Sequence, residues 1–255
     1  MTTASPTLIA EPAGAQRVWR VVRLNLVNKY TTIWVPISIM AFIWLVNWLI
    51  WWIIWGATEP ADRADAMDGT QWSGGGFYIF VYMLVVGIQV ITATFPFALG
   101  YSVTRRDFSL GSGLTFLLLS AGYAIGFAAL SVVEEWTNGW GLGGHLFTSV
   151  YFAGENFFGR LFIVFAGMLL FFLVGSFSAS LYMRWRMNGI LVAGAALVLL
   201  IVGAVALITF TGGWPAVGEW FASSGPVGVA AWLLLPGVLA GLAGYAVLGR
   251  ATPRN

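Results

Sequence analysis

The chain has 255 residues, of which 59% are apolar and only 9% carry a charge. A soluble domain averages about 25% charged residues, so this chain cannot cover its surface with charged side chains. Its 14 Trp, 19 Phe and 32 Gly are typical of membrane helices, in which interfacial aromatic residues and small residues are enriched. The composition therefore predicts an all-α polytopic membrane protein and leaves no room for a soluble nucleotide-hydrolysing domain.

Two other classes are excluded at the same stage. The net charge of +2 does not indicate a nucleic-acid-binding protein, because the basic residues are spread among short loops instead of gathering on one face. The absence of cysteine excludes disulfides, thiol nucleophiles and thiolate metal sites.

The first residues of the chain precede any membrane span. Residues 1–15 are expected to form a disordered tail, and residues 16–30 are expected to form an amphipathic helix on the cytoplasmic membrane surface. A cytoplasmic extension of the first span is the alternative. One face of this helix would hold Val18, Trp19, Val22, Leu26 and Tyr30, and the polar side would hold Arg17, Arg20, Arg23 and Asn28.

Six apolar stretches of 23 to 26 residues follow, and each is long enough to cross a hydrocarbon core of about 30 Å. They cover 33–56, 75–100, 110–133, 161–183, 187–210 and 227–249. The first is too long and too rich in Trp for a cleaved signal peptide. We therefore expect a six-helix transmembrane domain over residues 31–250, followed by a tail over 251–255.

The distribution of basic residues predicts the orientation. If the N-terminus is cytoplasmic, ten of the 12 basic residues lie inside and only Arg63 and Arg160 lie outside. Both termini are therefore expected in the cytoplasm, in a multi-pass protein of the plasma membrane. The ten are Arg17, Arg20, Arg23, Lys29, Arg105, Arg106, Arg184, Arg186, Arg250 and Arg254.

Two outer segments are too long to be simple turns. In the first, residues 146–158 are expected to form a short interfacial helix. Glu155 and Arg160 are expected to form an ion pair, and contact of the two with a polar substrate is the alternative. In the second, Pro215 stands where a helix would begin and Gly225 where it would end, which predicts a short dipping helix between spans five and six.

The spans contain no ionisable residue, which disfavours a proton-coupled carrier. Their chief polar residues are Asn47 and Gln89, at similar predicted depths in the membrane. A mutual hydrogen bond between them is one interpretation, and a substrate path is the other.

Enzymatic chemistry is poorly supported. The only histidine is His145, so one chain cannot form a two-histidine metal site, and Glu134 and Glu135 are expected to be solvated loop residues. The only lysine is Lys29, which follows no glycine-rich loop, so a phosphate-binding loop is absent. We therefore expect no metal or cofactor on this chain, and any ATP-driven work must come from another polypeptide.

The cytoplasmic loop after span two has the composition of a docking knob, with two arginines, an acid and aromatic residues on a short turn. An ordinary positive-inside turn is the alternative. The residues concerned are Tyr101, Ser102, Thr104, Arg105, Arg106, Asp107 and Phe108.

The chain resembles one known family, the permease subunits of ABC-2 type transporters. The likeness lies in six spans with both ends inside, an amphipathic helix before the first, a short polar helix after the second and a dipping helix after the fifth. It extends to the stretch Pro-Phe-Ala-Leu-Gly-Tyr-Ser-Val-Thr-Arg-Arg-Asp-Phe over residues 96–108, which is similar to small permeases of high-GC Gram-positive bacteria.

The resemblance implies a type V exporter-like arrangement in which residues 101–108 form the coupling helix of a separate ATPase. Two permeases, the same or similar, would pair with two ATPase subunits that hold the ATP and Mg. It implies export of a hydrophobic or amphipathic substrate such as a drug, antimicrobial peptide or lipid. Small-residue faces at Gly122 with Gly126 and at Gly237 with Gly241 would let helices approach closely. The alternatives to a permease subunit are an accessory membrane subunit and a channel or secondary carrier.

Overall fold

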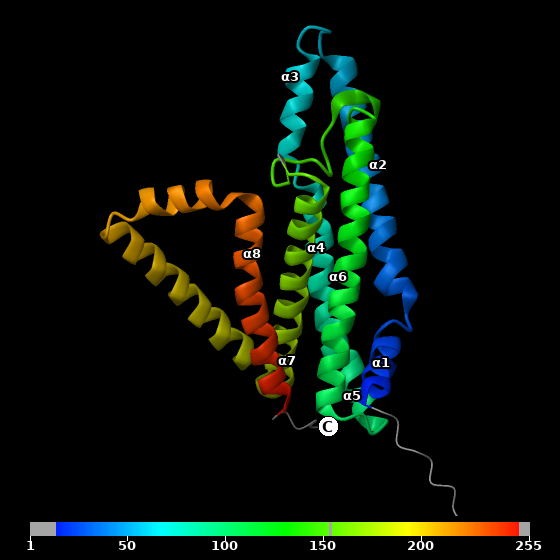
Figure 1. The fold of residues 1–255 in the computed structure, drawn as a ribbon, viewed down its shortest axis with the longest axis vertical. Coiled ribbons are helices and arrows are strands. Elements are labelled where there is room, and N and C mark those ends of the chain that lie inside the picture. The colour runs from blue at the N-terminus through cyan, green and yellow to red at the C-terminus, as the bar shows by residue number, and fades with distance from the viewer. Residues whose placement is uncertain (1–13, 153–154, 250–255) are drawn as a thin grey trace, which may run out of the picture.

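The computed structural model describes residues 14–152 and 155–249, and these ranges are helical with no strand (Figure 1). The predicted tails therefore lie outside the described residues, except that Gly14 and Ala15 already belong to the first helix. The α-helices are α1 (Gly14–Asn25), α2 (Val35–Ala57), α3 (Arg63–Asp68), α4 (Tyr78–Gln89), α5 (Phe95–Gly100), α6 (Arg105–Trp136), α7 (Phe157–Phe210) and α8 (Trp214–Gly249). Short π or 3-10 segments are η1 (Tyr30–Trp34), η2 (Gly69–Trp72), η3 (Gly75–Phe77), η4 (Val90–Thr94) and η5 (Gly139–Gly143).

Five helical stretches are long and apolar enough to cross a membrane, which confirms the predicted all-helical membrane class. They are Tyr30–Ala57, Arg63–Gly100, Arg105–Trp136, Phe157–Phe210 and Trp214–Gly249.

The last two of these stretches are each broken by one residue with a positive φ. In α7 the break is at Arg186, with φ 56° and ψ −148°, and the predicted spans four and five lie on either side of it. In α8 the break is at Gly225, with φ 63° and ψ 175°, so residues 214–224, the segment predicted as a dipping helix, form a separate helical part of α8. Figure 1 shows the second part of α7 leaning away from the other helices.

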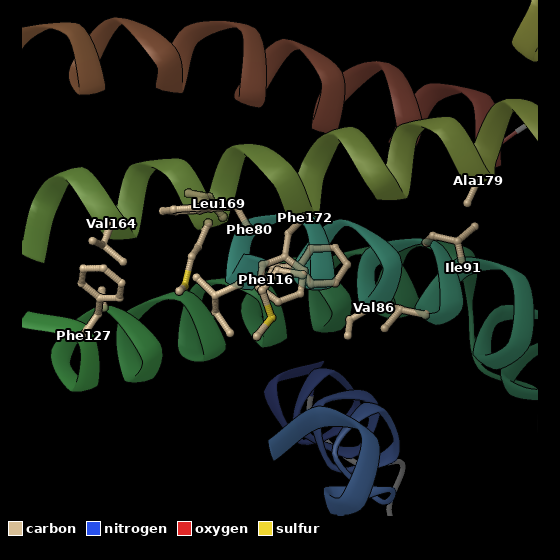
Figure 2. Close-up of a cluster of buried hydrophobic side chains, with 14 of the residues drawn as sticks. Phe80, Val86, Ile91, Phe116, Phe127, Val164, Leu169, Phe172 and Ala179 are labelled. Atoms are coloured by element: carbon tan, nitrogen blue, oxygen red, sulfur yellow. The ribbon is translucent and has the colours of Figure 1, made fainter. Parts of the chain in front are cut away.

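The core lies where α4, α6 and the first part of α7 meet (Figure 2). Phe116 of α6 stacks on Phe172 of α7, with ring centroids 4.9 Å apart. A Cβ at Gly175 would lie 2.2 Å from the carbonyl oxygen of Leu84, so the backbones of α7 and α4 touch at this crossing. Side chains from three helices therefore interleave around one close backbone contact.

The first helix, α1, packs along the start of α6. Val21 fits over Gly111, where a Cβ would come 2.4 Å from the Val21 side chain. Asn25 Nδ2 donates to the hydroxyls of Ser112 (3.2 Å) and Thr115 (3.3 Å). The predicted helix therefore forms, but it ends at Asn25 instead of residue 30. Its buried residues are Val21, Val22 and Asn25, whereas Trp19, Arg20 and Arg23 are exposed.

The start of α2 is held by two tyrosine hydroxyls. Pro36 has no backbone N–H, so it cannot bond the carbonyl of Thr32 in α-helical register or that of Thr31 in π-helical register. Tyr82 of α4 donates to the Thr31 carbonyl (2.6 Å), and Tyr123 of α6 donates to the Thr32 carbonyl (2.6 Å). The groups that the proline leaves unpaired thus anchor α2 to two other helices.

We predict that Tyr82→Phe and Tyr123→Phe each destabilise the protein by about 1 to 3 kcal/mol, because each leaves a carbonyl without a donor in an apolar environment. Thermal unfolding of the detergent-solubilised protein measures this effect. Tyr78→Phe is a matched control, because the buried Tyr78 hydroxyl has no hydrogen-bond partner within the described residues. Equal melting temperatures for all three variants would contradict the anchoring role.

Candidate functional site

The loop expected to form a coupling helix is a turn. α5 ends at Gly100 and α6 begins at Arg105, so residues 101–104 form no helix of their own, and the expected short polar helix is absent from this part of the structure. Ser102 has a φ of 59°, and Thr104 caps α6 by accepting the backbone N–H of Asp107 at 3.1 Å. Because Thr104 is the N-cap, Arg105, Arg106 and Asp107 lie in the first turn of α6.

Three of the expected coupling residues are engaged inside the chain. Asp107 forms an ion pair with Arg17 of α1 at 3.2 Å, and Phe108 is fully buried. Arg105 Nη1 donates to the carbonyl of Gly249 at 2.9 Å, which ties the start of α6 to the end of α8. Asp107 and Phe108, expected to contact a partner, are therefore both engaged within the chain in this structure. The exposed members of the set are Tyr101, Ser102, Thr104 and Arg106.

The two polar residues expected to share a site in the membrane do not meet. Asn47 Nδ2 donates to the Ile43 carbonyl (2.8 Å), and Asn47 Oδ1 accepts from Ser73 (3.2 Å). Gln89 is exposed and makes no hydrogen bond within the described residues. The predicted membrane depth gives the height of a residue along its helix but not the direction in which its side chain points. It therefore does not predict whether Asn47 and Gln89 meet.

Glu134, expected to be solvated, is a buried anchor of the loop that follows α6, with 1% of its surface exposed. This loop is called the outer loop because the sequence predicts it on the outer side. Its Oε1 accepts the backbone N–H groups of Leu146 (3.0 Å), Phe147 (3.0 Å) and Thr148 (2.9 Å). The Thr148 hydroxyl (2.6 Å) and the Trp140 indole N–H (2.9 Å) also donate to this carboxylate. Hydrogen bonds to a charged acceptor are stronger than bonds between neutral groups, so these donors hold the Glu134 carboxylate in its buried position.

The neighbouring Glu135 also holds the outer end together. It pairs with Arg160, which is 7% exposed and also donates to the Phe152 carbonyl at 3.3 Å. The predicted pairing of Arg160 with Glu155 is therefore wrong. The predicted helix over 146–158 is not formed in the described part of that range: residues 146–152 are turns and bends, and α7 begins at Phe157. The Glu134 carboxylate, instead of a helix, satisfies the backbone there.

A polar cavity of about 520 Å³ lies beside Glu134 and Glu135. Asp68 Oδ1 is 3.9 Å from His145 Nε2, and His145 Nδ1 is 2.9 Å from the Thr148 hydroxyl. Across residues 14–152 and 155–249, no three His, Asp or Glu side chains are grouped so that they could hold a metal ion. The groups beside the cavity connect α3 to the outer loop.

A larger cavity, of about 760 Å³, separates α2 from α6. Its walls are apolar, and Trp44 and Trp140 meet edge to face at its outer end, with ring centroids 5.0 Å apart. Gly122 and Gly126 form part of the α6 wall, and a Cβ at either position would meet no atom within 4 Å. Hydropathy alone does not reveal this cavity, because it depends on how far α2 stands from α6.

Comparisons with known protein families, with curated proteins and with solved structures found no match to this chain.

We predict that Glu134→Gln opens the outer loop, because an amide offers N–H groups where donors already converge and loses the charge that strengthens these bonds. A single cysteine at the buried Leu146, in this cysteine-free chain, should react with a thiol reagent several-fold faster in the Glu134→Gln background. The fall in stability should be about 1 to 3 kcal/mol. The exposed Glu59, changed to Gln, is the control. Unchanged reactivity at position 146 would rule out the anchoring role of Glu134.

Proposed function

We propose that the chain is the permease subunit of an ATP-driven transporter of the ABC-2 type. In this proposal it exports a hydrophobic or amphipathic substrate and works with a separate ATPase that holds the ATP and Mg. The chain would act as six spans, with α7 crossing twice about Arg186, and both termini would lie in the cytoplasm.

The observation that carries the proposal is the short helix at the start of α8. Residues 214–224 form a helix that is broken from the rest of α8 at Gly225, and this helix lies beside the bundle, roughly perpendicular to the rest of α8 (Figure 1). A dipping helix after the fifth span, together with a helix before the first, is the arrangement that the sequence shares with ABC-2 permeases. α1 supplies the second of these features.

The ends of the described helices support the proposed orientation. Arg17 of α1 meets Asp107 of α6, and Arg105 meets the last residue of α8, so these three helix ends lie together. Both basic side chains are therefore at the end where the chain enters and leaves the bundle. The positive-inside rule assigns such an end to the cytoplasm.

The surface proposed for the ATPase is smaller than the whole motif. Tyr101 is 72% exposed, and Arg106, five residues further on, is also exposed, whereas Phe108 belongs to the core. An aromatic residue and an arginine are the side chains that most often dominate interface energies. Since the adjoining Arg105 and Asp107 are tied to α8 and α1, a force on this turn would reach three helices at once.

We predict that Arg106→Glu weakens copurification of the ATPase by about 2 to 5 kcal/mol if the guanidinium is buried in the contact, and uncouples substrate-stimulated ATP hydrolysis. Arg184→Glu, an exposed charge change at another cytoplasmic turn, is the control. Normal copurification and hydrolysis with Arg106→Glu would remove this turn as the coupling element. Copurification without any stimulated hydrolysis in the unaltered chain would favour an accessory subunit instead.

The proposed second permease has a candidate contact face on α4 and the segment that follows it. The small-residue face at Gly237 and Gly241 is already used within the chain, against Leu170 and Leu173 of α7. A different stripe is exposed at four-residue spacing, with Gln89 in its middle. Its members are Val81, Val85, Gln89, Ala93 and Phe97.

An amide on an apolar face at membrane depth needs a hydrogen-bond partner, because the hydrocarbon core offers none. A primary amide both donates and accepts, so Gln89 of one copy fits Gln89 of a second copy across a two-fold axis. We therefore propose that this face pairs with the same face of a second copy.

We predict that a single cysteine at Val85 cross-links to itself in a second copy under oxidising conditions, whereas one at the exposed Leu239 does not. Adding Gln89→Leu should weaken the dimer by about 0.6 to 2 kcal/mol, the range found for interhelical polar contacts in membranes. Cross-linking yield on denaturing gels measures both effects. A strong cross-link at Leu239 and none at Val85 would place the contact elsewhere.

A further inference from the structure

The cavity between α2 and α6 is closed at both ends and open at its side. At its inner end the Tyr123 hydroxyl is held by the Thr32 carbonyl, next to Pro36. At its outer end Trp140, whose indole N–H is bonded to Glu134, packs against Trp44. Buried side chains of three helices form its back wall, namely Ile79, Phe127 and Met168.

Its position along α6 places the cavity at membrane depth. The α6 residues that line it fall between 118 and 130, which is about 20 to 38 Å from the start of the helix at Arg105. Both walls belong to stretches apolar enough to cross a membrane. A molecule can therefore reach the open side only from within the bilayer.

Size and chemistry select the occupant. The cavity extends about 18 Å along α6, and a helix of about 10 Å diameter would need about 1,400 Å³ over that length. The cavity volume of 760 Å³ is about half of that, so an occupant slimmer than a helix fits it better. Among the described residues that line it none is charged, and the Tyr123 hydroxyl is already bonded. The Trp44 indole N–H is the one buried side-chain donor of this lining without a partner among the described residues, so a slim, uncharged and mainly apolar group fits best.

We infer that this cavity is a binding site for one acyl chain of a bilayer phospholipid. The chain lies along the glycine face at Gly122 and Gly126, between the proline-anchored start of α2 and the tryptophan pair at the outer end. The inference does not depend on transport or on an ATPase, because the site is formed by one copy of this chain alone.

The test uses the full chain in vesicles that contain a phosphatidylcholine with a photoreactive alkyl diazirine in its acyl chain. After illumination, mass spectrometry of peptides should find adducts concentrated in 33–44 and 118–130. Labelling of these peptides should saturate as the photoreactive fraction rises, whereas labelling at the exposed second part of α7 should rise in proportion. Proportional labelling everywhere would overturn the inference.

Variants that fill the cavity provide the second arm. The double variant Gly122→Leu and Gly126→Leu puts side chains into free space, so folding should be retained and labelling of the two peptides should fall about fivefold or more. Gly203→Leu, also free of neighbours within 4 Å but on α7, is the matched control and should leave the labelling unchanged. Undiminished labelling in the double variant, or a cross-link from a cysteine at Gly122 to a second copy, would overturn the inference. If the double variant does not fold, the saturation measurement on the unaltered chain still decides it.

Discussion

The structure depends on the rule that a backbone polar group in an apolar medium must find a partner within the protein. Pro36 breaks the hydrogen-bond ladder at the start of α2, and the hydroxyls of Tyr82 and Tyr123 take the two carbonyls that lose a donor. At the other end residues 144–152 are not helical, and the Glu134 carboxylate accepts the N–H groups of Leu146, Phe147 and Thr148. Tertiary contacts thus form where secondary structure fails.

These two sets of hydrogen bonds also determine the position of α2. Tyr123 fixes its start against α6, and the loop latched by Glu134 brings Trp140 against Trp44 farther along the helix. Between the two points α2 meets no α6 side chain at Gly122 and Gly126, where a Cβ would have no atom within 4 Å. The cavity is therefore a consequence of anchoring a helix at both ends over a glycine face, and it does not require a defect in the core.

The sequence predicts the helices well because long uncharged runs and their flanking charges mark where a chain can cross a membrane. It also places the break before the main part of α8, since Pro215 and Gly225 have defined preferences for helix starts and ends. It does not predict the ion pair of Arg17 with Asp107, the ion pair of Glu135 with Arg160 or the exposure of Gln89. Those features depend on helix rotation and on contacts between distant segments, which hydropathy does not encode.

The continuous helix α6 joins the features that carry functional meaning. Asp107 in its first turn holds α1, Tyr123 near its middle holds α2, and Glu134 in its last turn holds the outer loop. Asp107 and Glu134 are about 40 Å apart along one helix that contains no proline. A displacement at the basic end is therefore passed to the outer loop by a rigid element. Because Tyr123 lies between them, such a displacement must also move the inner boundary of the cavity between α2 and α6.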